Sequence, residues 1–436
     1  MAVLGDRPAG AGRPLQVVNA RLPHAVLRAL ELAMDGTGPA ILPRRFDADV
    51  ATIDGELVEA GAGDDAAGLE LPPDAPSDAC LVIETSGSTA APKRVVLTAR
   101  ALRASGAATY RRLDELAGRR GGQGSGDAFP ERQWLLCLPA EYVAGAQVLA
   151  RSLAAGTTPV VMPEGGFTAE AFLAACREMT GDRRYTSLVP AQLLRLLEAA
   201  EADDATGTAL AIVLAGFDGI LVGGQGMPPA LRRRASALGW RIVATYGSSE
   251  TAGGCVYDGR PLDGVEARAR DGELELSGPT LAWGYLDDLA RTADRFRQEG
   301  GRRWYRTGDA GEAGPDAEGG TRVRVTGRLD DVIISGGEKV MLGRVEALVR
   351  SRPGLEAAVV VGAPSEEWGQ APAVVLESGA VPGDDAALLA ELRELAGAEL
   401  GRAAKPALIC RVDELPRLVS GKPDRRALAE LLRSPS

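Results

Sequence analysis

The first two-thirds of the chain alternates between short apolar runs and longer segments in which apolar residues recur at helical spacing. Short apolar runs bounded by turn-forming residues favour strands, and longer amphipathic segments favour helices. The predicted strands are 80–84, 134–138, 158–162, 187–189, 219–222 and 241–245. The predicted helices are 24–34, 98–117, 145–155, 168–179, 190–202 and 228–238. This alternation is typical of α/β layers built on a mostly parallel sheet.

The pattern changes after about residue 255. Residues 273–277 and 322–326 alternate apolar and polar side chains with period two, which predicts half-buried strands of an antiparallel sheet or barrel. A smaller unit follows, with predicted strands 331–334, 357–361, 372–376 and 408–412 and predicted helices 343–351, 384–400 and 424–433. We therefore expect a large α/β domain over residues 1–329 that includes a small β-barrel-like part. A small α+β domain should cover residues 330–436.

Composition places the chain among ordinary globular proteins. Of its 436 residues, 45% are hydrophobic and 25% charged, so it can bury a large core. The net charge of −11 argues against a nucleic-acid or anionic-membrane partner, since both require a positive surface. No apolar run is long enough for membrane insertion, and the N-terminus lacks the apolar segment of a signal peptide. Five scattered cysteines fit a reduced, cytoplasmic protein, either monomeric or a homo-oligomer.

Histidine is almost absent. His24 is the only one, at the start of a predicted helix. Histidine-rich metal sites are therefore excluded, and a Ser-His or Cys-His nucleophilic mechanism is disfavoured, because His24 fits a surface or helix-start residue better than a catalyst.

Lysine is also rare, with four among 49 basic residues. Lys93, Lys339 and Lys422 each follow a short glycine/serine loop, while Lys405 does not. A chain that uses arginine elsewhere retains lysine where a compact point charge is needed, and Gly/Ser backbone beside lysine is how many proteins hold phosphates. The alternative is that a GC-rich genome replaced most lysines and these survived by chance.

The first of these loops, Thr85-Ser-Gly-Ser-Thr-Ala-Ala-Pro-Lys93, follows a predicted strand and precedes a predicted helix. Its hydroxyl groups and backbone N–H groups suit a polyphosphate, and Lys93 adds positive charge. The spacing does not match a Walker A loop. An ordinary connecting loop is the alternative.

Two further motifs follow predicted strands. In Tyr246-Gly-Ser-Ser-Glu-Thr251 the tyrosine could stack on a base, and Glu250 could hold Mg²⁺ together with phosphates. In Tyr305-Arg-Thr-Gly-Asp309 the aspartate could accept hydrogen bonds from ribose hydroxyl groups. Each motif alone is weak, because such turns are common.

Together with 327–339 and Ser420-Gly-Lys422, these blocks resemble in order and spacing the adenylate-forming superfamily of acyl- and aryl-CoA ligases, luciferases and adenylation domains. The resemblance covers residue 80 to the C-terminus. The segments 138–152, 221–225 and 246–259 resemble more narrowly the o-succinylbenzoate–CoA ligases of menaquinone biosynthesis.

The resemblance implies a site and its ligands: ATP, Mg²⁺, coenzyme A and a carboxylic acid. ATP would be bound by Thr85, Ser86, Gly87, Ser88, Thr89, Lys93, Gly223, Gly224, Gln225, Tyr246, Gly247, Asp309 and Arg328. The catalytic residues would be Lys422, Thr251 and Glu250, with Glu250 also holding the metal. The acid would meet Tyr142, Gly145, Arg151, Ser248 and Gly253. CoA would pass Gly336, Gly337 and Lys339 once the mobile small domain had turned about a hinge at Asp330.

This chemistry requires no protein nucleophile. The acid's carboxylate attacks the α-phosphate of ATP, and the resulting acyl-adenylate is attacked by the CoA thiol. Because two anions must meet, positioning and positive charge from Lys422 and Mg²⁺ carry most of the catalysis.

Two departures from the family pattern leave alternatives open. Ala90 stands where a glycine is usual, which should weaken the approach of backbone to phosphate. Glu141 and Tyr142 stand in a region that usually carries a histidine, and a glutamate there should repel a carboxylate. The chain could therefore activate another aryl or acyl acid, or be a non-catalytic homologue. Arg151 is either a partner for a second carboxylate or a structural arginine.

Overall fold

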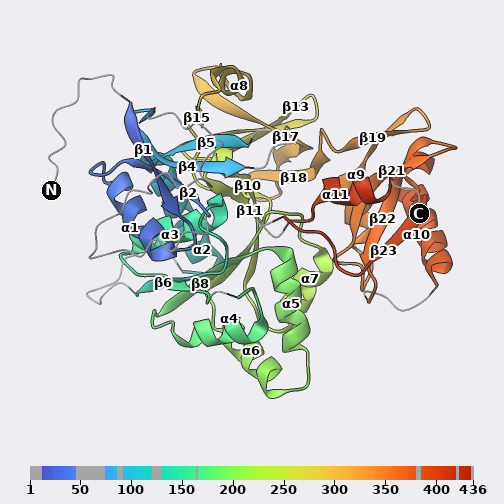
Figure 1. The fold of residues 1–436 in the computed structure, drawn as a ribbon, viewed down its shortest axis with the longest axis horizontal. Coiled ribbons are helices and arrows are strands. Elements are labelled where there is room, and N and C mark those ends of the chain that lie inside the picture. Colours follow the sequence, from blue (N-terminus) through green and yellow to red (C-terminus); the bar gives the residue numbers. More distant parts are fainter. Residues whose placement is uncertain are drawn as a thin grey trace, which may run out of the picture.

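The computed structural model describes residues 12–45, 74–85, 92–119, 130–163, 165–379, 384–418 and 422–433. Four sheets organise these residues, three in a large unit and one in a small unit at the opposite end of the molecule from the first strand, β1 (Figure 1). The predicted α/β architecture with a smaller C-terminal unit is confirmed.

The first sheet is six-stranded, in the order β15-β5-β4-β2-β1-β3. Its strands are β1 (Arg13–Asn19), β2 (Ala40–Arg44), β3 (Asp74–Ala75), β4 (Ala79–Thr85), β5 (Lys93–Thr98) and β15 (Gly284–Tyr285). β4 and β5 are antiparallel, with Thr85 opposite Lys93. The predicted phosphate loop therefore closes a hairpin between two strands. The helix predicted after the loop forms as α2 (Ala99–Leu116), but the sequence interpretation missed the strand before it, in which the β-branched and apolar residues of 93–98 complete the sheet.

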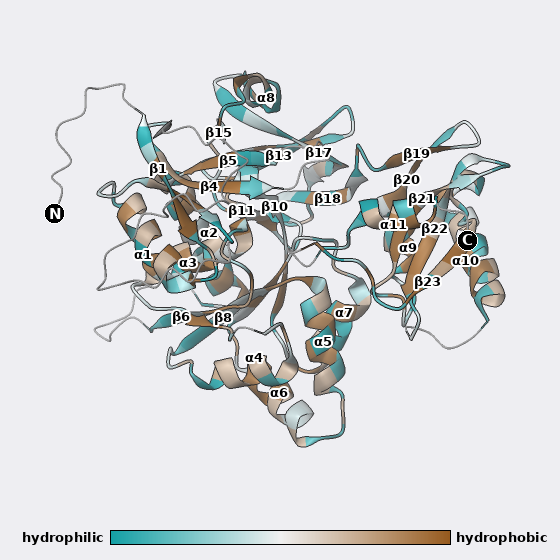
Figure 2. Ribbon diagram, viewed as in Figure 1, coloured by the Kyte–Doolittle hydropathy of each residue, from teal (hydrophilic) through white to brown (hydrophobic). Residues whose placement is uncertain are grey.

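The second sheet is seven-stranded, in the order β12-β11-β10-β9-β8-β6-β7, and is parallel from β10 to β7. Its strands are β6 (Arg132–Leu136), β7 (Val160–Val161), β8 (Arg183–Leu188), β9 (Gly219–Val222), β10 (Ile242–Ser248), β11 (Gly253–Tyr257) and β12 (Arg260–Pro261). The parallel strands that were predicted all form. The central strand β9, Gly-Ile-Leu-Val, is apolar and buried throughout, as expected for a strand covered on both faces, whereas β8 is polar in sequence except for Tyr185 and Leu188 (Figure 2).

Helices cover both faces of this second sheet. α2 (Ala99–Leu116) and α3 (Val143–Ala155) lie between the first two sheets with α1 (Pro23–Met34), around a core that includes Trp134 and Leu149. The outer layer, built around Phe172 and Phe217, consists of α4 (Ala169–Arg177), α5 (Pro190–Ala200), α6 (Ala205–Ala215) and α7 (Pro229–Ala237). The sequence interpretation missed α6, because its apolar residues surround the helix and leave no amphipathic stripe.

The third sheet is antiparallel, as the period-two pattern predicts. It contains β13 (Glu266–Arg270), β14 (Glu273–Ser277), β16 (Phe296–Glu299), β17 (Arg302–Pro315) and β18 (Thr321–Arg328). A short helix, α8 (Leu289–Arg295), connects β15 of the first sheet to β16 of this one. The sequence interpretation did not anticipate α8.

The small unit holds the fourth sheet, in the order β20-β19-β22-β21 with β23 on β22. Its strands are β19 (Val332–Ser335), β20 (Glu338–Met341), β21 (Val359–Ser365), β22 (Gly369–Glu377) and β23 (Leu408–Val412). Its helices are α9 (Leu342–Val349), α10 (Asp385–Leu400) and α11 (Arg425–Leu431). Each element predicted beyond residue 330 is present, and β20 is added by a tight turn at Gly336–Gly337.

Candidate active site

Lys422 of the small unit reaches the turn after β9 in the large unit. A Cβ placed on Gly224 would stand 3.6 Å from Lys422 Cε. Burial and the charge of Arg328 lower the pKa of the Lys422 ammonium, while Asp309 and Glu250 oppose that shift. Residues predicted from five separate motifs therefore meet in one place, although Lys422 is distant in sequence from the other four.

A chain of polar contacts joins β10 to the boundary between the two units. The Tyr246 hydroxyl donates to Asp309 Oδ2 at 2.7 Å, and Arg328 Nη1 lies 3.2 Å from Asp309 Oδ1. Arg328 also donates two 2.9 Å hydrogen bonds to the Asp330 carboxylate. These bonds lower the pKa of Asp330, whereas burial raises the pKa of Asp309. Arg328 thus connects Asp309, which is predicted to bind the ribose, to Asp330, which is the predicted hinge.

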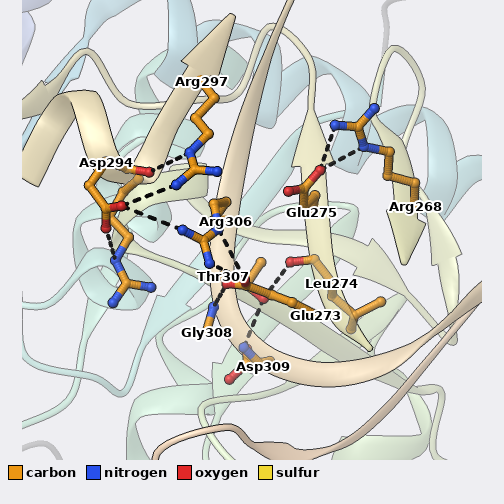
Figure 3. Close-up of polar contacts among 11 residues, drawn as sticks. Arg268, Glu273, Leu274, Glu275, Asp294, Arg297, Arg306, Thr307, Gly308 and Asp309 are labelled. Carbon is orange, nitrogen blue, oxygen red and sulfur yellow. Dashed lines mark hydrogen bonds and ion pairs between the residues drawn. The ribbon is translucent and has the colours of Figure 1, made fainter. Parts of the chain in front are cut away.

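The loop that carries Asp309 is fixed by the neighbouring strand β14 (Figure 3). Thr307 donates from Oγ1 to the Leu274 carbonyl at 2.8 Å and accepts from the Asp309 N–H at 3.0 Å. Glu273 accepts from the Gly308 N–H at 2.9 Å and from Arg306 at 2.7 Å. With its backbone held from two sides, Asp309 presents its carboxylate in one orientation.

Glu250 and Thr251 lie in the single 3₁₀ turn Ser249–Thr251 after β10. Glu250 is buried and accepts a 2.9 Å hydrogen bond from the Tyr285 hydroxyl. Thr251 Oγ1 accepts from the Ser248 N–H at 2.9 Å and lies 2.8 Å from the Gly253 carbonyl oxygen, to which it can donate. These contacts fix the turn. Among the described residues no group of three or more His, Cys, Asp or Glu side chains could enclose a metal. One carboxylate shared with substrate phosphates suits Mg²⁺, which retains most of its other ligands as water or phosphate oxygen.

Several predicted glycines are required by close backbone approach. A Cβ on Gly247 would stand 2.1 Å from the Gly253 carbonyl oxygen, and one on Gly223 would stand 2.3 Å from Thr245 Oγ1. A Cβ on Gly145 would stand 2.2 Å from the Pro139 carbonyl oxygen. Gly253 itself has a φ of 87°, which favours glycine.

The predicted phosphate loop is seen only at its two ends. Thr85 and Lys93 face each other across the hairpin, while Ser86, Gly87, Ser88, Thr89 and Ala90 lie outside the described residues. Glu84 at the base of the hairpin contacts Arg44 at 2.6 Å and Arg94 at 3.1 Å. Burial opposes ionisation of Glu84, but the two guanidinium groups outweigh it and lower the pKa of the carboxyl. The base of the loop is therefore cross-linked by charge to β2.

Glu141 has a partner that the sequence interpretation did not find. Arg45, after β2, lies 3.2 Å from Glu141 Oε1. This pairing offsets the negative charge, so the expected repulsion of a carboxylate substrate is weaker than the sequence implied. Burial and Glu141 raise the pKa of Tyr142, which leaves its hydroxyl protonated and able to donate.

Arg151 is 3% exposed and packs in the core between α2 and α3. Its guanidinium carbon lies 5.1 Å from the Trp134 ring, and Nη2 donates to the Tyr257 hydroxyl at 3.3 Å. Of the two alternatives for this residue, these contacts favour the structural one. Gln147, one helical turn earlier, donates to the Ala252 carbonyl at 2.6 Å and contacts the turn at Gly253.

Gly336, Gly337 and Lys339 lie on the β19–β20 hairpin, at one edge of the small unit's sheet and away from β10 (Figure 1). The two glycines have φ values of 57° and 86°, as a two-residue hairpin turn requires. A Cβ on Gly336 would stand 2.4 Å from the Trp368 ring. The structure thus separates these three residues from the site where Lys422 lies.

Comparison with known proteins agrees with this geometry. Residues 36–286 match the family described as AMP-binding enzyme, and residues 344–422 match its C-terminal domain. The chain belongs to the AMP-binding enzyme family. The resemblance to adenylate-forming enzymes is thereby confirmed.

Individual members of the family are similar over most of the chain. The probable 2-succinylbenzoate–CoA ligase of Mycobacterium tuberculosis strain H37Rv is 38% identical, over 80% of this chain and 84% of that protein. The 2-succinylbenzoate–CoA ligase of Salmonella typhimurium strain LT2 is 32% identical, over 69% of this chain and 58% of that protein. The Bacillus subtilis o-succinylbenzoate coenzyme A synthetase in complex with AMP superposes with a TM-score of 0.61 at 25% identity, over 80% of this chain and 69% of that one.

The sequence interpretation missed several residues that shape this AMP-binding enzyme's site. Tyr285, Arg45 and Gln147 each contact a predicted site residue from a distant element. For Tyr285 a signal existed, because it is an aromatic residue after Gly284 within the short apolar segment 281–286. For Arg45 there was none, since one arginine among many carries no information about its partner.

Proposed function

We propose that the chain is an ATP-dependent acid–CoA ligase that activates 2-succinylbenzoate as an acyl-adenylate and transfers it to CoA, in menaquinone biosynthesis. The single observation that carries the adenylation step is the arrival of Lys422 beside Gly224, Asp309 and Glu250. The succinylbenzoate substrate is supported by the names of relatives that share 38% and 32% identity.

The nucleotide would lie between the turn after β9 and the Asp309 loop. Asp309 would accept hydrogen bonds from the ribose with Arg328 beside it, and Tyr246 and Gly247 would lie along the adenine. Gln225 Nε2 is buried without a hydrogen-bond partner among the described residues, so it is available to donate to the base. Thr85, Ser86, Gly87, Ser88, Thr89 and Lys93 would hold the phosphates.

Adenylation would then proceed by positioning and charge. A carboxylate oxygen of the acid forms a bond to the α-phosphorus while the bond from that phosphorus to the bridging oxygen breaks and pyrophosphate leaves. Lys422 would stabilise the charge that develops there, and Thr251 would face the α-phosphate. Mg²⁺ bound through Glu250 would neutralise phosphate charge. The acid would lie toward Tyr142, Ser248 and Gly253.

The second half-reaction requires a different arrangement. The CoA thiolate sulfur forms a bond to the acyl carbon. The bond between that carbon and the phosphate oxygen breaks, and AMP leaves. We propose that residues 330–436 rotate about Asp330, which removes Lys422 and brings Gly336, Gly337 and Lys339 to the site. The reaction would take place in the cytoplasm, where ATP and CoA are available.

A panel of acids tests the substrate. Purified protein with ATP, Mg²⁺ and CoA should release AMP and form a thioester with 2-succinylbenzoate in preference to benzoate, anthranilate and medium-chain fatty acids. Turnover on one of those acids and none on 2-succinylbenzoate would retain the ligase and reject this substrate. The absence of adenylate with every acid, despite ATP binding in calorimetry, would favour a non-catalytic homologue.

A further inference from the structure

The helix α8 begins beside the strand that carries Lys93. β15 pairs with β5, and the Leu286 N–H donates to the Arg94 carbonyl at 2.8 Å. Three residues later α8 starts at Leu289. The chain therefore places α8 next to the point where the phosphate loop returns to the sheet.

Local packing fixes the position of α8. Thr292 Oγ1 donates to the Asp288 carbonyl and accepts from the Tyr285 N–H, both at 2.9 Å. Gly284 leaves room for that threonine, because a Cβ there would stand 2.4 Å from Thr292 Cγ2. At its other end, α8 is tied to the nucleotide loop through Asp294, Arg306 and Glu273, which accepts from the Gly308 N–H (Figure 3).

Arg291 and Arg295 lie one turn apart on α8, and both approach residues of the candidate active site. The Arg291 guanidinium carbon lies 5.7 Å from the centroid of Tyr285, whose hydroxyl donates to Glu250. Arg295 Nη1 and Arg328 Nη2 lie 3.4 and 3.6 Å from the same point, the Cβ position of Gly308. Burial lowers the pKa of Lys93, Glu250 opposes that shift, and the positive charges of Arg291, Arg295 and Arg328 add to it. The positive charges of the three arginines therefore all act on Lys93.

The acidic groups on α8 do not balance these cations. Arg291 has Asp288 at 3.3 Å. The only α8 carboxylate near Arg295 is that of Asp294, at 3.6 Å, and this same carboxylate is shared with Arg297 at 3.3 Å and Arg306 at 3.4 Å. In a chain of net charge −11, an excess of guanidinium groups at the rim of a nucleotide site indicates an anionic ligand.

We propose that Arg291 and Arg295 form a binding subsite for the diphosphate group, that is, the β- and γ-phosphates of ATP and the pyrophosphate released from it. This subsite rests on the proposed function, which places the α-phosphate near Lys422. When the bond between the α-phosphorus and the bridging oxygen breaks, the electron pair remains on that oxygen. The two guanidinium groups stabilise the resulting charge on pyrophosphate through paired N–H donors. They also supply positive charge to the phosphates, which a loop with Ala90 in place of glycine would hold less closely.

Direct binding of inorganic pyrophosphate tests the subsite. By calorimetry, Arg291→Gln and Arg295→Gln should each weaken pyrophosphate binding about fivefold, and the double variant about twentyfold, because each removes one charge-assisted contact in a partly solvated position. AMP binding should change less than about twofold in the same variants. Arg270→Gln, which removes an exposed arginine of β13 that pairs with Glu299, is the matched control and should bind pyrophosphate like the wild type.

Half-reactions provide the second readout. The double variant should raise the pyrophosphate KM in reversal of adenylation, and should form thioester from preformed acyl-adenylate at the wild-type rate. An R291K/R295K variant keeps the charge without the planar fork, so its pyrophosphate KM should lie between those of the wild type and the double glutamine variant. This lysine variant still tests the subsite if the double glutamine variant fails to fold.

Wild-type pyrophosphate affinity in the double variant would overturn the subsite, as would equal losses of AMP and pyrophosphate binding. A wild-type protein that binds pyrophosphate through these arginines but activates no acid would instead reject the proposed function and leave the subsite standing.

Discussion

The Tyr246 hydroxyl donates a 2.7 Å hydrogen bond to Asp309 Oδ2, between residues 63 positions apart. The contact joins the end of β10 to the loop in β17, so the two motifs form one wall of the site. Burial and Asp309 raise the pKa of Tyr246, so the phenol remains a donor at neutral pH.

Removing this donor should weaken nucleotide binding. Tyr246→Phe keeps the ring but leaves Asp309 without one partner, at a cost of about 1 kcal/mol. The KM for ATP should rise about fivefold while kcat changes little. Asp309→Asn is the companion variant and should raise the KM further. An unchanged KM in both would show that Asp309 does not contact the nucleotide.

Lys422→Ala should separate the two half-reactions. Because the ammonium would act on the developing phosphate charge, adenylation should slow by about a hundredfold to a thousandfold. Thioester formation from preformed acyl-adenylate should remain within about threefold of wild type, since Lys422 would have left the site by then under the proposed rotation. Lys405→Ala provides a control at another lysine of the small unit. Equal losses in both half-reactions would contradict this role.

Adenylation should also lose activity at alkaline pH. Burial and Arg328 place the pKa of Lys422 below the ordinary lysine value of 10.5. Only the charged form binds phosphate, so kcat/KM for ATP should fall as the pH rises through that lowered pKa. Lys422→Arg remains charged and should move the decline to higher pH. If the decline stays in place, another group such as Lys93 causes it.

Asp330→Pro should produce the reverse of the Lys422 effect. Proline fixes its own φ and restricts Leu329 before it, so the chain should lose the rotation that we propose for the CoA half-reaction. Adenylation should persist and thioester formation should fall at least about tenfold. Asp330→Ser removes the ion pair with Arg328 but leaves the backbone free to rotate. It therefore separates the effect of the lost ion pair from the effect of the lost rotation. Normal thioester formation in the proline variant would reject the hinge.

Glu346→Gln should destabilise the small unit. Glu346 is buried, accepts from the Val360 N–H at 2.9 Å and from Arg425 at 2.6 Å, and lies 3.1 Å from Arg350. Loss of its charge removes the carboxylate beside the buried Arg350 and leaves Arg425 with only Asp331, at 3.8 Å, among the described residues, so the free energy of unfolding should fall by about 3 kcal/mol. Chemical denaturation measures this. Arg426→Ala, which breaks the exposed pair with Glu430, should change the same quantity by less than about 0.5 kcal/mol. Similar effects of the two changes would contradict the prediction.

The sequence by itself determined most elements of the fold and predicted the residues of the candidate site. Strands such as Ala79–Thr85 and Gly219–Val222 and helices such as Ala99–Leu116 follow from the local period of apolar residues, which no distant contact overrides. Tyr246, Glu250, Asp309 and Lys422 were predicted from the order of their motifs.

Only the tertiary structure decided how distant segments meet. The two ends of the predicted phosphate loop, Thr85 and Lys93, lie opposite each other because β5 pairs with β4, a pairing that local periodicity does not encode. Arg45 pairs with Glu141, and Arg151 packs on Trp134, because packing set their partners. The arginines of α8 acquired a predicted role only once that short helix was placed beside Lys93. The sequence does not show which groups a charged side chain faces, because the packing of distant segments determines its partners.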